Sequence, residues 1–245
     1  AYYNMGNALQ EQGKLEEAIE AYNKAHELNP TFDNQMVLSE LLLRHSKDAS
    51  ASLLLLESAL LKNPRNTRAI AYKTIALRGL ERFEDAEKLI DFSTLVRTEN
   101  IQRYTNKNIT DFNEQLLQKL IEHPKRAPEL NLAGWAIRGG TAIRNLFINA
   151  DPVIKTFEGM LRKAIDDRIS SLPDSDEHPF LIRKPDNYRL DCWANLLDSG
   201  DYQSNHIHNN GWMSGVYYVS IPEITPDDPE DSGWIEFNRT GYNLP

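Results

Sequence analysis

The sequence has few of the residues that mark secreted, membrane or nucleic-acid-binding proteins. It holds a single cysteine, Cys192, so no internal disulfide can form and a reducing cytoplasm is predicted. The longest apolar run, 53–56, is far shorter than the roughly 18 residues of a membrane span, and no secretion signal is visible. Lys and Arg number 27 against 36 Asp and Glu. That deficit of positive charge argues against nucleic acid as a partner.

The composition that is present belongs to an ordinary globular protein. Hydrophobic residues make up 40% and charged residues 26% of the chain. A length of 245 residues allows one large or two ordinary domains. The chain starts inside a motif at Ala1 and stops at Pro245 without a closing element. We therefore predict a fragment that is truncated at both ends.

The first hundred residues repeat with a period of about 34 residues. In the first unit, apolar residues recur at helical spacing: Tyr2, Met5, Leu9, Ala18, Tyr22 and Ala25. The aromatic and Leu positions among them are expected to be core. Gly6 and Ala18 are small where two helices must approach closely. Gly13 separates the two helices, and Pro30 ends the second. The unit therefore predicts a close-packed helix pair.

Later units follow the same pattern more weakly. One period further on, the equivalent positions hold Leu43, Ser52, Leu56, Ala59 and Pro64. A third period gives Leu77, Phe83 and Ala86, with no proline after them. The first unit closely resembles the tetratricopeptide repeat, and the resemblance extends over residues 1–98, which implies an α-solenoid. Such solenoids often bind a peptide or partner protein on a concave surface, and a rigid spacer or dimerisation surface is the alternative.

Two further helices are predicted beyond a connector. Residues 99–109 lack periodicity and form this connector. Helical spacing resumes after Thr110 or Asp111, either of which could cap the helix that ends before His123. A second helix is predicted over residues 152–170, where apolar residues again recur at helical spacing.

The hydrophobic period then changes from helical to two. Side chains alternate from Tyr188 to Leu196, and the segments 215–221 and 233–237 are rich in β-branched and aromatic residues. The second domain, residues 110–245, is therefore predicted to begin with helices and to continue as antiparallel β-structure.

His206 and His208 give the strongest chemical signal. In a strand, residues i and i+2 point to one face and lie about 6.5–7 Å apart, so two imidazoles can converge on one metal. An octahedral metal held on one face needs a third protein ligand and keeps positions open for a cosubstrate and dioxygen. Alone, the pair is a weak signal, and surface, hydrogen-bonded or structural-zinc histidines are alternatives. The remaining histidines are predicted to be structural: His26, His45, His123 and His178.

Several segments occur in one order along the chain: RGGTAIRNLF, HPFL, WANLLDSG, HIHNNGWMSGVYYVSIP and SGWIEF. Together they resemble a bacterial family of 2-oxoglutarate- and Fe(II)-dependent oxygenases, in which tetratricopeptide repeats often precede the oxygenase domain. The resemblance covers residues 110–245. It implies a double-stranded β-helix (a jelly roll) with flanking helices, which binds Fe(II) and the cosubstrate 2-oxoglutarate.

The resemblance also assigns roles to residues. It makes His206 a metal ligand, and His208 stands where the wider superfamily usually has a carboxylate, so it is also expected to bind the metal. Tyr218 matches a tyrosine that binds the distal carboxylate of the cosubstrate, with a core aromatic as the alternative. Asn195 and Gln203 are expected to line the same pocket. Together these residues form the predicted site.

The expected remainder of the site is missing from the sequence. The family continues into a segment with the last metal histidine and a basic residue for 2-oxoglutarate. Here no histidine follows His208, and Arg239, the one later basic residue, comes too early to match. We therefore expect the third metal ligand and the cosubstrate arginine to lie beyond this sequence.

The sequence thus predicts an α+β multidomain chain, an α-solenoid followed by an incomplete jelly roll. The predicted function is a dioxygenase that hydroxylates a C–H bond of a protein or peptide docked on the repeats. The alternative is a non-catalytic interaction scaffold whose β-domain has lost its site. Unpaired edges of an incomplete sheet also make a homodimer an option.

Overall fold

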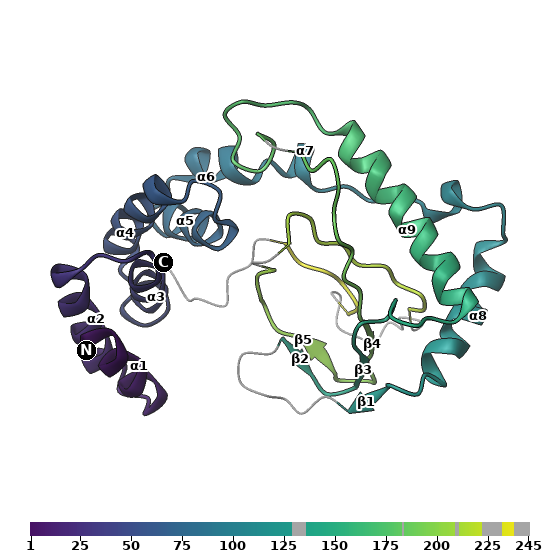
Figure 1. Cartoon of the computed structure of the whole chain (residues 1–245), viewed down its shortest axis with the longest axis horizontal. Helices are drawn as coiled ribbons and strands as arrows, with labels where there is room; N and C mark the ends of the chain where they lie inside the picture. Colours follow the sequence, from purple (N-terminus) through teal and green to yellow (C-terminus); the bar gives the residue numbers. More distant parts are fainter. Residues whose placement is uncertain (129–135, 183, 209–210, 222–231, 238–245) are drawn as a thin grey trace.

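The computed structural model describes residues 1–128, 136–182, 184–208, 211–221 and 232–237. Figure 1 shows an arc of helices beside a second part, in which further helices arch over small sheets. The arc consists of α1 (Tyr2–Glu11), α2 (Leu15–Leu28), α3 (Phe32–Leu41) with its π-helical extension η1 (Leu42–Ser46), α4 (Ala49–Lys62), α5 (Thr67–Gly79) and α6 (Phe83–Ile90). Among the described residues, no helix is both long and apolar enough to span a membrane.

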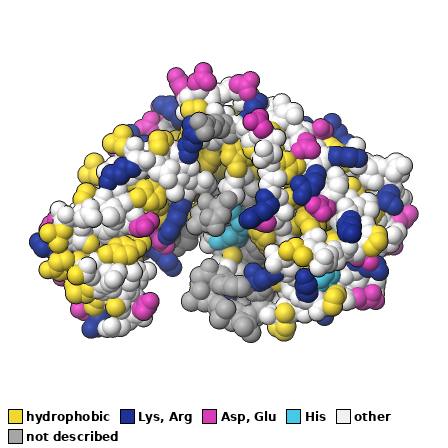
Figure 2. Space-filling model, viewed as in Figure 1, with side chains coloured by type: hydrophobic (Ala, Val, Ile, Leu, Met, Phe, Trp, Pro, Cys, Tyr) yellow, Lys and Arg dark blue, Asp and Glu magenta, His cyan; other side chains and the backbone are white. Residues whose placement is uncertain are grey.

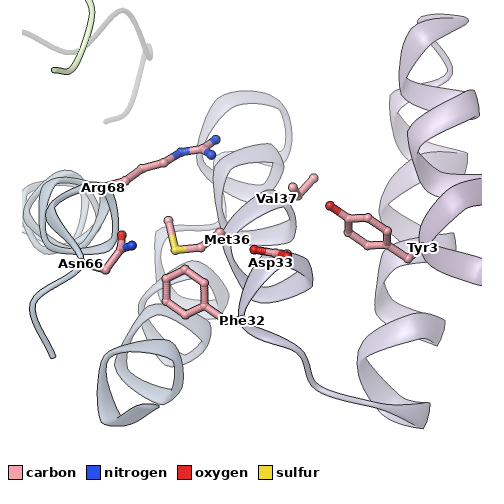
Figure 3. A pocket seen from close by; sticks show the side chains of 7 residues that line it. All are labelled: Tyr3, Phe32, Asp33, Met36, Val37, Asn66 and Arg68. Carbon is pink, nitrogen blue, oxygen red and sulfur yellow. The ribbon is translucent and has the colours of Figure 1, made fainter. Parts of the chain in front are cut away.

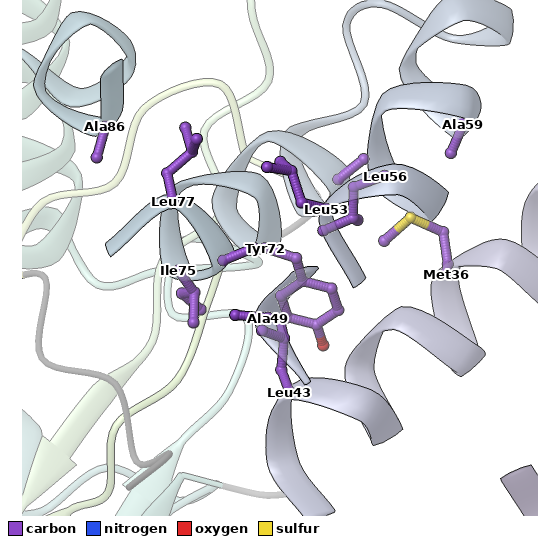
Figure 4. Close-up of a cluster of buried hydrophobic side chains, with 12 residues drawn as sticks. Met36, Leu43, Ala49, Leu53, Leu56, Ala59, Tyr72, Ile75, Leu77 and Ala86 are labelled. Carbon is purple, nitrogen blue, oxygen red and sulfur yellow. The ribbon is translucent and has the colours of Figure 1, made fainter. Parts of the chain in front are cut away.

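Helices of the arc pack on their neighbours in chain order. Tyr22 of α2 is fully buried, and a Cβ added to Gly6 of α1 would lie 2.6 Å from its ring atom Cε1. The predicted close approach at Gly6 is therefore confirmed, and Gly13 takes a φ of +75° between the two helices. Figure 4 shows the cluster that joins the later helices, which includes Met36, Leu43, Leu56, Tyr72 and Leu77.

Most of the positions named in the second and third repeat units are buried, as predicted, whereas a few predicted core positions are exposed. At most 1% of each of these side chains is exposed: Leu43, Ser52, Leu56, Ala59, Leu77 and Ala86. Tyr2 and Phe83 were predicted to be buried and are 40% and 49% exposed, and Met5 is 47% exposed. Because α1 packs on α2, its other face stays open. Phe83 instead lies under the guanidinium of Arg78, 5.7 Å from its ring centroid.

The predicted connector contains ordered structure. α7 (Phe92–Leu95) and the 3₁₀ helix η2 (Ile101–Tyr104) lie before and within it. Ile101 and Tyr104 are buried in the core of the second part. The cap of the next helix, α8 (Ile109–Ile121), is Asn108, whose side chain accepts hydrogen bonds from the N–H groups of Thr110 and Asp111. The prediction that Thr110 or Asp111 caps this helix is wrong, because the accepting oxygen belongs to Asn108, two residues before Thr110.

The second part combines α8 and α9 (Pro152–Ser171) with short antiparallel strands. These are β1 (Ala127–Pro128), β2 (Ile137–Arg138), β3 (Thr141–Ile143), β4 (Ala194–Leu196) and β5 (Tyr202–Gln203). β3 lies between β1 and β4 in one sheet, and β2 pairs with β5 in the other. Buried side chains of both helices, such as Phe112 and Phe157, pack with Ile143 of β3 in one core. This core supports the strands that lead to the candidate site.

The predicted strands are only partly paired. Of residues 188–196, only β4 joins a sheet, and residues 214–221 run without ladder pairing in the described part of the chain. The period of two is nevertheless visible, because Tyr217 and Val219 are half-buried while Val216 and Tyr218 are exposed. Alternation encodes an extended chain with two faces, whereas a ladder also needs a partner strand. Helices followed by a few strands are thus observed, and the jelly roll stays a prediction.

Candidate metal centre

The two candidate metal histidines follow β5 directly. β5 pairs with β2, where Gln203 lies opposite Ile137. Ser204 then donates two hydrogen bonds to the carbonyl of Ala136, from its backbone N–H at 2.8 Å and from Oγ at 3.0 Å. Residues 206–208 lie beyond the last ladder pair, so the prediction that they belong to a strand is wrong. The pairing with β2 ends at Ser204 and fixes the chain just before the histidines.

The imidazoles of His206 and His208 converge. Their Nε2 atoms lie 3.0 Å apart, and their rings meet at 77° with centroids 4.7 Å apart. Two nitrogens bound to one metal at about 2.1 Å in neighbouring octahedral positions are separated by about 3.0 Å. The described geometry therefore fits two ligands on one octahedral metal.

The surroundings of His208 favour the neutral, metal-binding form of its imidazole. His206 Nδ1 lies 2.8 Å from the carbonyl oxygen of Ser204, and the ring of Trp193 packs against that of His208 with centroids 5.6 Å apart. Desolvation lowers the pKa of His208, and the neighbouring His206 lowers it further. The residue still contacts solvent. A lowered pKa keeps the imidazole in the neutral form that metals require.

The other predicted site residues lie within about a dozen residues of the pair in the sequence. Asn195 is in β4, opposite Ala142, and Gln203 is an exposed residue of β5. Tyr218 is 42% exposed. Within the described ranges, no hydrogen bond joins any of these residues to His206 or His208. Their roles stay predictions.

A complete metal site is not formed by the residues that the structure describes. Among them, no group of three or more His, Cys, Asp or Glu side chains could hold a metal ion. Arg239 lies outside the described residues.

Sequence reasoning also missed Ser204 and Trp193. A backbone carbonyl carries no sequence signal, whereas the aromatic residue in the WANLLDSG segment was a visible candidate.

Residues 191–242 match the family described as "Putative 2OG-Fe(II) oxygenase". Residues 1–32 match the tetratricopeptide repeat. The predicted combination of repeat and oxygenase segment is therefore confirmed, and both histidines lie in the oxygenase segment. Among solved structures, the crystal structure of the yeast Tom70 is similar with 23% identity and a TM-score of 0.34, over 55% of this chain and 30% of that chain. This chain thus spans less than a third of that protein, and no curated protein matches it.

The tetratricopeptide arc has a cavity of its own, separate from the oxygenase segment. Its volume is about 260 Å³, and Figure 3 shows its lining residues from α1, α3 and the start of α5: Tyr3, Phe32, Asp33, Met36, Val37, Asn66 and Arg68. Arg68 is held by Glu40 at 2.5 Å and donates to the Tyr72 hydroxyl at 3.3 Å. The volume is below the roughly 300–1,000 Å³ of pockets for drug-sized ligands.

Proposed function

We propose that the protein containing this chain is a Fe(II)- and 2-oxoglutarate-dependent oxygenase. The observation that carries the proposal is the 3.0 Å separation of the Nε2 atoms of His206 and His208, which suits two neighbouring positions on one octahedral metal. The family match over residues 191–242 supports iron as that metal. Together they favour a redox site over a structural zinc site, since structural zinc is almost always bound by four protein ligands.

Each residue has a defined task in this proposal. His206 and His208 hold the metal, and the exposed Tyr218 hydroxyl binds the distal carboxylate of 2-oxoglutarate. Bound iron and 2-oxoglutarate supply the oxidation of a substrate C–H bond by dioxygen, with succinate and carbon dioxide as products. Trp193 covers one side of the His208 ring and limits the approach of water from that side. The described residues do not supply a third side-chain ligand beside the two histidines.

The substrate in this proposal is a protein or peptide bound by the repeats. Tetratricopeptide repeats generally bind proteins, and the cavity of the arc offers such a partner both apolar groups, such as Phe32, and charged groups, Asp33 and Arg68. Figure 1 places β5 and the chain after it on the side of the second part that faces the arc. Figure 2 shows histidine surface at the hollow between the two parts. A polypeptide held by the arc could therefore extend toward the histidines.

An anaerobic titration tests the metal and cosubstrate. Fe(II) and then 2-oxoglutarate are added to the protein, and the visible charge-transfer absorption of the chelated complex is recorded. The band is expected in the wild type, to be absent in His206→Ala, and to be unchanged in His123→Ala, whose imidazole lies outside the predicted site. No band in the wild type, with iron absent by elemental analysis, would favour the alternative of a non-catalytic interaction scaffold.

The substrate, cellular location and assembly need separate measurements. Capture of substrate by the protein with and without residues 1–98 tests docking, and unchanged capture without the repeats would contradict it. Light scattering tests the predicted homodimer. A cytoplasmic location stays a prediction from the single cysteine.

A further inference from the structure

We infer that Ser204 is a positioning residue that holds His206 in the tautomer whose Nε2 is free to bind a metal. The metal-binding part rests on the proposed function, whereas the tautomer part does not depend on it.

The tautomer of His206 follows from its contact with Ser204. Nδ1 of His206 lies 2.8 Å from the Ser204 carbonyl oxygen. A carbonyl oxygen only accepts hydrogen bonds, so the proton must be on Nδ1. In neutral imidazole one nitrogen carries the proton and the other a lone pair, which leaves Nε2 of His206 as the acceptor.

The contact with His208 agrees with this assignment. The two Nε2 atoms are 3.0 Å apart, a hydrogen-bond distance at which one nitrogen must donate. Nε2 of His206 carries no proton and therefore accepts, so Nε2 of His208 donates this hydrogen bond when no metal is bound. A metal ion placed between them would replace that shared proton, and His208 would then carry its proton on Nδ1. His206 alone is pre-set for ligation.

The carbonyl of Ser204 points at His206 because the residue is fixed from the other side. Its N–H and its Oγ both donate to the carbonyl of Ala136, at 2.8 and 3.0 Å. Ala136 precedes β2, whose Ile137 is only 6% exposed and pairs with Gln203. The hydroxyl thus adds a second restraint to the same acceptor, so Ser204 is held to Ala136 by both its own N–H and its side chain. The serine side chain acts on the histidine through its own backbone.

This arrangement has the form of an outer-shell contact of a metal ligand. A ligating histidine usually donates its other ring N–H to a carboxylate, a backbone carbonyl or a water, which fixes the ring and the tautomer. Loss of such a partner typically lowers metal affinity about 10–100-fold. Ser204 is a backbone partner secured by one hydroxyl, so the lower end of that range is expected when the hydroxyl is removed.

The first measurement is the tautomer itself in the metal-free protein. ¹⁵N-labelled histidine is observed by NMR, and the ring signals are assigned with His206→Ala and His208→Ala. The proposal expects His206 to carry its proton on Nδ1 and His208 on Nε2. A His206 protonated on Nε2 overturns the proposal, whatever the outcome of any metal titration.

The second measurement compares two substitutions at the same position. Ser204→Gly removes the hydroxyl and frees the backbone, whereas Ser204→Thr keeps a hydroxyl at Oγ. Co(II) titration of the full chain should show about 10-fold weaker binding for Ser204→Gly and wild-type binding for Ser204→Thr. Equal affinity of Ser204→Gly and wild type would overturn the positioning role. Co(II) binding that survives His206→Ala would instead contradict the proposed metal site, and the tautomer result would still decide the role of Ser204.

Discussion

The hydroxyl of Tyr217 donates a 2.7 Å hydrogen bond to Oδ1 of Asn113 on α8. The Tyr217 ring packs against the ring of Phe157 on α9, with centroids 5.0 Å apart. Residues 215–221 are thereby fixed to both helices that cover the second part. Successive side chains of an extended chain point to opposite faces, so Tyr218 is turned outward. Adjacent tyrosines therefore have separate tasks: Tyr217 anchors the segment, and Tyr218 is available to a ligand.

Replacing Tyr217 by Phe should lower the free energy of unfolding by about 1 kcal/mol, because Oδ1 of Asn113 then loses its donor while the ring contact with Phe157 is kept. Urea denaturation followed by circular dichroism measures the loss. Tyr218→Phe is the matched control, since its hydroxyl is exposed and has no hydrogen-bond partner among the described residues. It should leave stability unchanged and weaken 2-oxoglutarate binding. Equal losses of stability in the two variants would contradict the division of tasks.

A second prediction concerns the contact between α1 and α2. Gly6→Ala should gain about 1 kcal/mol of helix propensity, but its Cβ would lie 2.6 Å from the ring of Tyr22. That ring cannot move aside, because it is fully buried and its hydroxyl donates to Oδ1 of Asn7 at 2.6 Å. Overpacking of this kind costs about 1–3 kcal/mol, so a net loss of stability is expected.

The same substitution at Gly159 of α9 is the control. A Cβ added there meets no atom within 4 Å, so Gly159→Ala keeps the propensity gain without a clash. Its melting temperature should rise, whereas that of Gly6→Ala should fall. If Gly6→Ala is also stabilised, the close approach of the two helices is not what requires glycine at that position.

The sequence predicted the repeats well because the contacts that build them are local. Leu43, Leu56 and Leu77 recur at a fixed period, and each is buried by the helix next to it in the chain. The same logic found His206 and His208, since an i, i+2 spacing is also local. Tyr2 and Met5 lie on a face of α1 that no other helix in the described part of the chain covers. The helical spacing of apolar residues alone cannot distinguish such an exposed face from a buried one.

The rest of the site depends on contacts between distant parts of the chain. Ser204 and Ala136 are 68 residues apart, and their hydrogen bond exists only because β5 pairs with β2. No local pattern encodes that pairing. Likewise, the alternation at residues 214–221 predicted two faces but not the missing ladder partner. Local spacing thus identified the candidate ligands, whereas their support required the tertiary structure.

The thiol of Cys192 should react slowly. Its pKa is raised from 9.0 to about 11, first by burial and then by the negative charge of Glu158. At pH 8 the thiolate fraction should be about 100-fold smaller in the folded protein than in urea, and alkylation by iodoacetamide correspondingly slower. Because the folded state favours the neutral thiol, this group stabilises the fold below pH 9, and its contribution falls as the pH rises toward 11.

A matched variant separates the two causes of this pKa shift. Glu158→Gln removes the charge but not the burial, so alkylation should become faster than in the wild type and stay slower than in urea. The pH at which the rate reaches half of its high-pH plateau reports the pKa directly. Alkylation of the native protein at the rate seen in urea would show that Cys192 is not shielded.

Trp193 should report metal binding by its fluorescence, because its ring centroid lies 5.6 Å from that of His208. Co(II), which is paramagnetic, is expected to quench part of the tryptophan emission, whereas Zn(II) should bind with little quenching because its d shell is filled. The chain has 4 tryptophans, so the difference between wild type and Trp193→Phe isolates this residue. His206→Ala should remove the Co(II) effect while leaving the metal-free emission intact. Quenching of equal size in Trp193→Phe would place the bound metal away from His208 and contradict the proposed centre.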